Sequence, residues 1–167
     1  QLITLGIKTL YLILHANAED HGLLKNDYNR NIISKGKERA IRIANELATQ
    51  LKINNNTLVI SSSANRAKQT ADIFCEILGY PLTDILETRE IYEAHFIDIL
   101  RIINNVPNNV ENLLVFGHNP GLSNLTNYLS HAEVELATSN VAILSLPDNF
   151  NFSELAGGTA TLLNTIQ

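Results

Sequence analysis

Short, uninterrupted apolar runs, separated by segments with helical spacing, constrain the fold of this chain more than any other feature. The runs are rich in strand-forming residues and too short to be separate helices. They occupy residues 10–14, 57–60, 113–116, 141–146 and 161–166. In the first three runs apolar residues stand at consecutive positions, so these strands are expected to be buried on both faces.

Four segments between the strands have the spacing or the boundary residues of helices. In the first of them apolar side chains recur at Ala40, Ile43 and Leu47, which is the period of a helix with one buried face. Gly79 and Pro107 stand where the second and third segments end. The predicted helices cover residues 35–51, 66–78, 96–106 and 120–129.

Strands that alternate with helices indicate an α/β domain with a mostly parallel central sheet, arranged as a three-layer αβα sandwich. The chain has 167 residues, and we found no internal repeat, low-complexity tract or linker. We therefore predict a single domain over residues 1–167. The loop at residues 17–31 and the extended or irregular segment at residues 85–91 are the main parts without a regular pattern.

Composition argues against several classes of partner. The formal net charge is -5, and nucleic-acid binders usually carry a basic face. No apolar run approaches the ~20 residues that a membrane helix needs, and residues 2–7 are too short for a signal peptide. The one cysteine, Cys75, excludes an internal disulfide and fits a cytoplasmic protein. Its apolar surroundings favour a buried side chain over a nucleophile.

Reactive residues follow three of the predicted strands. The first strand ends at His15, the second at Ser61–Ser63 with Arg66 just beyond, and the third at His118–Asn119. Because the carboxyl ends of parallel strands lie at one edge of a sheet, we expect these side chains to meet there. Each of them alone could be an ordinary turn or capping residue. Together, two histidines and an arginine suit phosphoryl transfer, in which an imidazole attacks phosphorus and cations stabilise the equatorial oxygens.

The motifs around these residues resemble the histidine phosphatase superfamily, and the last of them resembles its phosphohistidine phosphatase branch. Residues 12–16 resemble the strand that ends in Arg-His-Gly or Arg-His-Ala, and residues 61–71 the Ser-Ser-Pro-x-x-Arg-Ala-x-Gln-Thr-Ala motif. Residues 115–121 match the Gly-His-Asn-Pro-Gly form of that branch and residues 90–94 also resemble it, while the match at residues 33–40 is weak alone. The resemblance implies a phosphoglycerate mutase-like fold.

The resemblance also implies roles for these residues. His15 would accept the phosphoryl group, and Arg66, His118 and Asn119 would bind it. Members of the family need no metal or other cofactor. A phosphorylated histidine on a protein is the implied substrate, and a small phosphorylated metabolite is the alternative.

A carboxylic acid must protonate the leaving group. Glu90 falls where the family often carries this acid, and Glu93 is the second candidate.

One residue departs from the family pattern. Leu14 occupies the position of the arginine that precedes the nucleophile. Loss of one strong transition-state donor typically costs ~100- to 1000-fold in rate. Three interpretations follow: a slow phosphatase, a site completed by another cation such as Arg30 or Lys25, or a non-catalytic relative that only binds phosphorylated partners.

Overall fold

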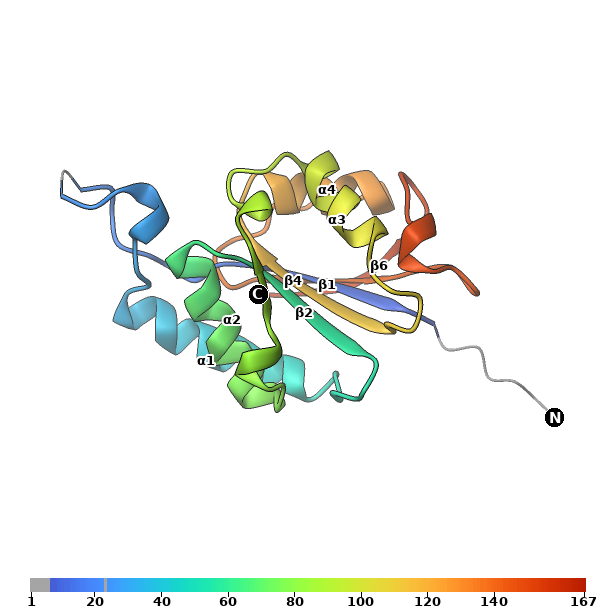
Figure 1. Ribbon diagram of the computed structural model, residues 1–167, viewed down its shortest axis with the longest axis horizontal. Coiled ribbons are helices and arrows are strands. Elements are labelled where there is room, and N and C mark those ends of the chain that lie inside the picture. The colour runs from blue at the N-terminus through green and yellow to red at the C-terminus, as the bar shows by residue number, and fades with distance from the viewer. Residues whose placement is uncertain (1–6, 23) are drawn as a thin grey trace.

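Six strands form one sheet in the order β3-β2-β4-β1-β5-β6 in a computed structural model that describes residues 7–22 and 24–167 (Figure 1). The strands are β1 (Thr9–Leu14), β2 (Thr57–Ser62), β3 (Leu86–Thr88), β4 (Asn112–Gly117), β5 (Val141–Ser145) and β6 (Thr161–Ile166). Neighbours among β3, β2, β4 and β1 are parallel, whereas β5 runs antiparallel to both β1 and β6. The mostly parallel sheet expected from the sequence is confirmed. Most of the apolar stretch at residues 2–7 lies outside the described residues.

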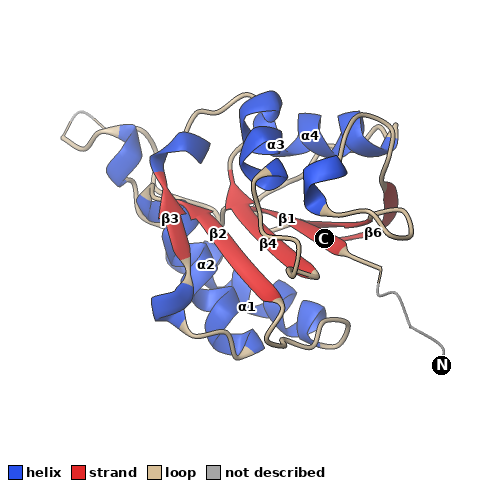
Figure 2. Ribbon diagram, turned by 45° about the vertical axis from the view of Figure 1, so that its right-hand side comes forward, coloured by secondary structure: helices blue, strands red, loops and turns tan. Residues whose placement is uncertain are grey.

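Helices cover both faces of this sheet, which makes the three-layer sandwich that the sequence predicts. The helices are α1 (Ser34–Ala48), α2 (Asn65–Leu78), α3 (Phe96–Asn104) and α4 (Gly121–Ser130). Helices α1 and α2 lie on one face, and α3 and α4 lie on the other (Figure 2). Within the described residues, none of the helices is both long and apolar enough to cross a membrane.

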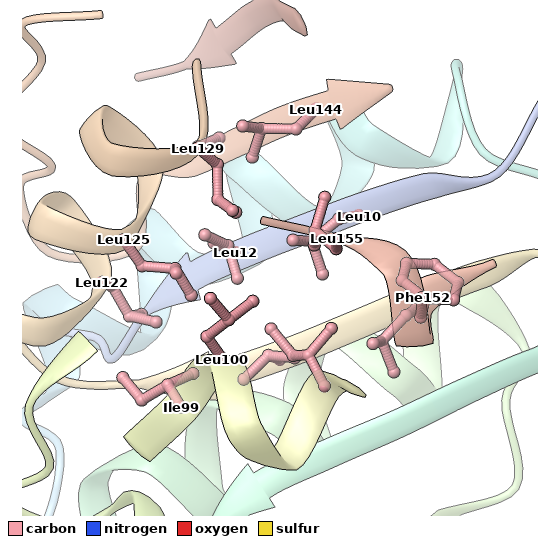
Figure 3. Close-up of a cluster of buried hydrophobic side chains, with 14 of the residues drawn as sticks. Leu10, Leu12, Ile99, Leu100, Leu122, Leu125, Leu129, Leu144, Phe152 and Leu155 are labelled. Carbon is pink, nitrogen blue, oxygen red and sulfur yellow. The ribbon is translucent and has the colours of Figure 1, made fainter. Parts of the chain in front are cut away.

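The side chains of β1 alternate between the two cores. Leu10, Leu12 and Leu14 belong to the apolar cluster under α3 and α4, while Tyr11 and Ile13 belong to the cluster under α1 and α2. Figure 3 shows Leu10 and Leu12 among leucines from α4 and side chains from α3. Each fully buried aliphatic side chain contributes about 1.5–3 kcal/mol by leaving water. This burial on both faces explains why β1 reads as a continuous apolar run.

Two irregular segments acquire short 3-10 helices that the sequence pattern did not reveal. The loop after β1 contains η1 (Asp27–Asn29), and the segment before α3 contains β3 and then η3 (Arg89–Ile91). In η1 the side chain of Asn26 accepts a hydrogen bond from the backbone N–H of Asn29. Both short helices are placed at the carboxyl edge of the sheet, next to the residues described below.

Candidate active site

The ends of β1 and β4 bring two histidines together. These strands are parallel neighbours, and Leu14 lies opposite Gly117 in their register. The next residue of each strand is a histidine, and the ring centroids of His15 and His118 are 5.3 Å apart. Strand β2 is the other neighbour of β4, so Arg66 in the first turn of α2 comes to the same edge. The three residues singled out in the sequence therefore share one rim of the sheet.

His15 has one ring nitrogen engaged by the backbone. Its Nδ1 lies 2.8 Å from the carbonyl oxygen of Ala16, and a carbonyl can only accept a hydrogen bond. We therefore assign the proton of the neutral ring to Nδ1, which leaves a lone pair on Nε2. Burial, with smaller contributions from the charges of Arg66 and Arg30, lowers the pKa of His15 to about 4 against the raising effect of the Ala16 bond. The imidazole is thus neutral near pH 7, as a nucleophile requires.

His118 is held from the neighbouring strand. Its Nε2 forms a 2.8 Å hydrogen bond with Oγ of Ser62, the last residue of β2, while its Nδ1 is buried without a partner. Burial, together with smaller effects of His15 and Arg66, lowers the pKa of His118 to about 3. The sequence placed Ser62 at a strand end but indicated no contact with a histidine, because the pairing of β2 with β4 is not encoded locally.

Arg66 is almost fully buried and points its guanidinium at the loop after β1. Its Nη1 donates to the backbone carbonyl of Asp27 at 2.8 Å, and its Nη2 donates to the Asp27 carboxylate at 3.0 Å. Its Nε is buried and has no partner. A charged donor without an acceptor is costly inside a protein, so this edge of the site is suited to an anion.

The Asp27 carboxylate accepts hydrogen bonds from residues of three different segments. Arg30 donates from Nε and Nη2 to one carboxylate oxygen, at 2.9 and 2.8 Å. Tyr92, just after η3, donates to the other oxygen at 2.6 Å. Desolvation opposes ionisation of Asp27, but the Tyr92 hydrogen bond and the Arg66 charge prevail and hold its pKa far below the usual range. Sequence reasoning missed both Asp27 and Tyr92, although the i, i+3 spacing of Asp27 and Arg30 was a signal.

The segment that carries Asp27 and Arg30 is tied to α2. Asn65 donates to the backbone carbonyl of Asn29, and the backbone N–H of Ile32 donates to the side chain of Gln69. Tyr28 donates to Oγ of Ser63 at 2.6 Å. The contacts with Asn65 and Gln69 hold the segment around Arg30 against α2.

Lys25, the other cation considered for the missing arginine, is turned away. It pairs with Glu19 at 2.8 Å, and both side chains are about two-fifths exposed. Its ammonium therefore neutralises a surface carboxylate. Of the two cations proposed from the sequence, Arg30 alone shares a partner with Arg66.

The two glutamates proposed as the acid lie in different hollows. Glu93 lines a cavity of about 230 Å³ together with His118 and His95. Glu90 is exposed and lines a separate hollow with Asp98 and Arg101 on α3. Burial raises the pKa of Tyr92 to about 12, with further contributions from Asp27 and Glu93, so the Glu93 carboxylate is close to the same cluster. The structure thus places Glu93 in the cavity of His118, whereas Glu90 lines a different hollow.

The sequence predicts that Asn119 binds the phosphoryl group, but in the structure its side-chain amide is hydrogen-bonded to other protein groups. Its Oδ1 accepts hydrogen bonds from the backbone N–H and the hydroxyl of Ser123, and its Nδ2 donates to the backbone carbonyl of Leu136. Both ends of the amide are occupied in capping α4 and holding the loop after it. We therefore assign Asn119 a structural task.

Leu14 and Cys75 are both core residues. Leu14 is 4% exposed and belongs to the cluster under α3 and α4, so this position supplies no donor to the site. Cys75, on the buried face of α2, is fully buried, and burial raises the pKa of its thiol to about 12. In the described part of the chain, no group of three or more His, Cys, Asp or Glu residues could hold a metal ion.

The architecture and the position of the histidines at the carboxyl rim define a phosphoglycerate mutase-like fold. No protein-family model and no curated protein matches the chain. Solved structures do: the protein histidine phosphatase SixA in complex with tungstate superimposes with a TM-score of 0.79 at 21% identity, covering 95% of this chain and 96% of that one. A proposed phosphohistidine phosphatase SixA from Agrobacterium tumefaciens gives the same score and identity, with coverages of 96% and 97%.

A mycobacterial glucosyl-3-phosphoglycerate phosphatase is a more distant structural relative. Its TM-score is 0.65 at 11% identity, and the match covers 94% of this chain and 97% of that one. At these identities the likeness shows a shared fold, and it confirms the fold that the sequence resemblance implied. The activity has to be argued from the residues of this chain.

Proposed function

We propose that this protein is a phosphatase that removes the phosphoryl group from a phosphorylated histidine of another protein, through a covalent intermediate on His15. One observation carries the proposal. A neutral imidazole with a free Nε2 lies 5.3 Å, between ring centroids, from a second imidazole, at the rim where a buried arginine keeps an unpartnered donor. This arrangement supplies a nucleophile and donors for an oxyanion in one place.

The reaction has two displacements. The lone pair on His15 Nε2 attacks phosphorus, the new P–N bond forms, and the bond from phosphorus to the leaving group breaks. Water then attacks the phosphorus atom on His15 and passes a proton to the carboxylate left by the acid of the first step. The P–N bond breaks, inorganic phosphate is released and the neutral ring is restored. The contact between Nδ1 and the Ala16 carbonyl keeps the ring oriented through both steps.

His118 and Arg66 are the donors to the transferred group. Ser62 Oγ accepts from the backbone N–H of Ala64, which leaves its own hydrogen free to be donated to Nε2 of His118. On this assignment the proton of His118 is on Nδ1, the buried atom without a partner. It can therefore donate to a phosphoryl oxygen, as can Nε of Arg66.

Arg30 supplies the guanidinium that is missing at position 14. It shares the Asp27 carboxylate with Arg66, and its charge acts on both histidines. Two guanidiniums at one rim can therefore balance the charge of the transition state although Leu14 contributes none.

Glu93 is the group best placed to protonate the leaving group. It lines the cavity that also includes His118, and a leaving imidazole or alkoxide beside His118 would lie within that cavity. Proton delivery at this position would complete the first displacement without a metal ion.

The comparisons support an oxyanion ligand and leave two kinds of substrate to compare. The SixA structure holds tungstate, a tetrahedral oxyanion like phosphate, and its name supports a protein phosphohistidine as substrate. The mycobacterial relative acts on a phosphorylated small molecule and supports the alternative. The higher structural similarity to the SixA proteins favours the phosphohistidine substrate.

Turnover of a phosphohistidine peptide, compared with a panel of sugar phosphates and a model phosphoester, tests the proposal. We expect release of phosphate that is fastest with the peptide, unchanged by a chelator and abolished in His15→Ala. His131→Asn is the matched control, because His131 is an exposed residue at the end of α4. Full activity of His15→Ala would exclude this nucleophile, and tungstate binding without any turnover would indicate a non-catalytic phosphate-binding protein.

A further inference from the structure

The Asp27 carboxylate is the common partner of the two arginines of the site. One of its oxygens accepts from Arg30, the other accepts from Arg66 and Tyr92, and its backbone carbonyl accepts a further hydrogen bond from Arg66. Both oxygens of this carboxylate therefore already accept hydrogen bonds, at the rim where we propose that an oxyanion binds. Such a carboxylate could either hold the arginines in place or compete with the oxyanion for them.

We propose that Asp27, supported by Tyr92, is a positioning residue that fixes Arg30 beside Arg66 as a paired oxyanion clamp. This inference rests on the proposed function, because it concerns the same oxyanion. It explains how a guanidinium from a loop can act in place of one that Leu14 does not carry. A loop arginine loses more side-chain entropy on binding than a preordered one, and a fixed ion pair removes much of that cost in advance.

The hydrogen bonds of Arg66 favour positioning over competition. The Asp27 carboxylate and carbonyl engage Nη1 and Nη2, whereas Nε remains buried and without a partner. A competing anion would be expected to satisfy the buried donor. Asp27 instead binds one side of the guanidinium and leaves a charged donor for another acceptor.

The backbone of Asp27 is also held in place by hydrogen bonds. A carboxylate that had to move away when the oxyanion binds would not need such a fixed backbone. Its carbonyl accepts from the backbone N–H of Arg30 as well as from Arg66. The side chain of Asn26 caps the same turn. Release of the carboxylate alone would therefore leave Arg66 bonded to the loop. The depressed pKa of Asp27 agrees with a permanent ion pair.

The two roles predict opposite effects of removing the charge. If Asp27 positions the arginines, Asp27→Asn weakens oxyanion binding because both guanidiniums lose their shared anchor. If Asp27 competes with the oxyanion, the same substitution strengthens binding, since a negative charge leaves the rim. The sign of the change therefore separates the two roles.

Calorimetric titration of the full chain with sodium tungstate at neutral pH is the test. We expect Asp27→Asn to bind tungstate about tenfold or more weakly than the parent protein, as for a misplaced charge-assisted contact. Asp27→Glu, which keeps the carboxylate, should recover part of this loss. Tyr92→Phe removes one donor to the carboxylate and should weaken binding about threefold.

Two control variants separate positioning from loosening of the loop and from a change in net charge. Tyr28→Phe removes the hydrogen bond between the same turn and Ser63 but keeps the ring that packs against Arg89 and Tyr92. Asp20→Asn removes a negative charge from an exposed position of the same loop. Both should bind tungstate within about twofold of the parent, because neither substitution removes a contact to Arg30, Arg66 or the Asp27 carboxylate.

The possible results are distinct. Weaker binding by Asp27→Asn with partial recovery by Asp27→Glu supports the inference. Unchanged or tighter binding by Asp27→Asn, or an equal loss in Tyr28→Phe, overturns it while the proposed phosphatase stands. Failure of the parent protein to bind tungstate overturns the proposed function and this inference with it. Should Asp27→Asn not fold, the comparison of Tyr92→Phe with Tyr28→Phe decides in the same way.

Discussion

His15 and His118 follow the carboxyl ends of two adjacent parallel strands, and their rings are 5.3 Å apart at an angle of 49°. At this separation a charge on one ring disfavours a charge on the other, which adds to the effect of burial. Both imidazoles are therefore neutral near pH 7 until an anion arrives. The relationship links the nucleophile and its partner electrostatically as well as in space, and the predictions below depend on it.

Arg30 should contribute far more to the site than Lys25. Arg30→Met removes a guanidinium that shares Asp27 with Arg66, so we expect turnover of a model phosphoester to fall about 100-fold, as for loss of one transition-state donor. Lys25→Met removes an exposed cation paired with Glu19 and should change the rate by less than about twofold. Steady-state kinetics of the two variants measure this difference, and an equal loss in both would point to a general effect of charge.

Glu93 should matter most for substrates with poor leaving groups. Glu93→Gln removes the acid from the cavity beside His118, so phenyl phosphate should be hydrolysed about 100-fold more slowly, while p-nitrophenyl phosphate, whose leaving group needs little protonation, is affected far less. Glu90→Gln should affect neither substrate, because Glu90 lines another hollow. If Glu90→Gln alone shows the dependence on leaving group, the roles of the two glutamates are reversed.

The central part of the site could be predicted because the ends of the strands can be recognised in the sequence. The apolar runs of β1 and β4 stop at His15 and His118, and parallel strands bring such ends to one edge. Arg66 follows β2 by the same logic. Burial on both faces explains why these strands appear in the sequence as short runs of consecutive apolar residues.

The rest of the site depends on contacts between segments without periodicity. Asp27 and Arg30 lie in a loop whose position is set by hydrogen bonds to α2, and Tyr92 follows a short 3-10 helix. Side-chain acceptors such as Gln69 can serve many partners, so their partners cannot be read from spacing. The preference for Glu90 over Glu93 came from position in the motif, and the sequence pattern did not indicate the turn after η3, where Glu93 adopts a positive φ of 56°.

Restoring an arginine at position 14 should make stability depend on the oxyanion. Leu14 is packed among apolar side chains, so Leu14→Arg should lower the free energy of unfolding by about 3 kcal/mol in buffer without oxyanions, because a charge is left without a partner. If the new guanidinium reaches the phosphoryl group, turnover should rise about tenfold and tungstate should restore most of the lost stability. Thermal unfolding with and without tungstate measures this. Leu14→Met, which conserves volume, should show neither effect.

Stability should fall as the pH is lowered from 7 to 5, and the two buried imidazoles are the cause. The pKa of His15 is lowered from 6.5 to about 4 in the folded protein, so between these values the unfolded chain binds more protons than the native one. Linkage then requires the free energy of unfolding to decrease as the pH falls through this range, by about 2 kcal/mol for His15 between pH 7 and pH 5. Asp27 acts in another window, since its depressed pKa gives stability that is lost only below its ordinary value of 3.8.

Urea unfolding at pH 7, 6 and 5 measures this slope directly. His15→Gln should flatten the slope, because an amide has no proton to gain, whereas the exposed His131→Asn should leave it unchanged. The slope matters here rather than the absolute stability, since any substitution in the site can alter packing. A parent protein whose stability is constant from pH 7 to pH 5 would mean that folding does not lower the pKa of the two imidazoles, and burial would then not be the reason that the nucleophile is neutral at pH 7.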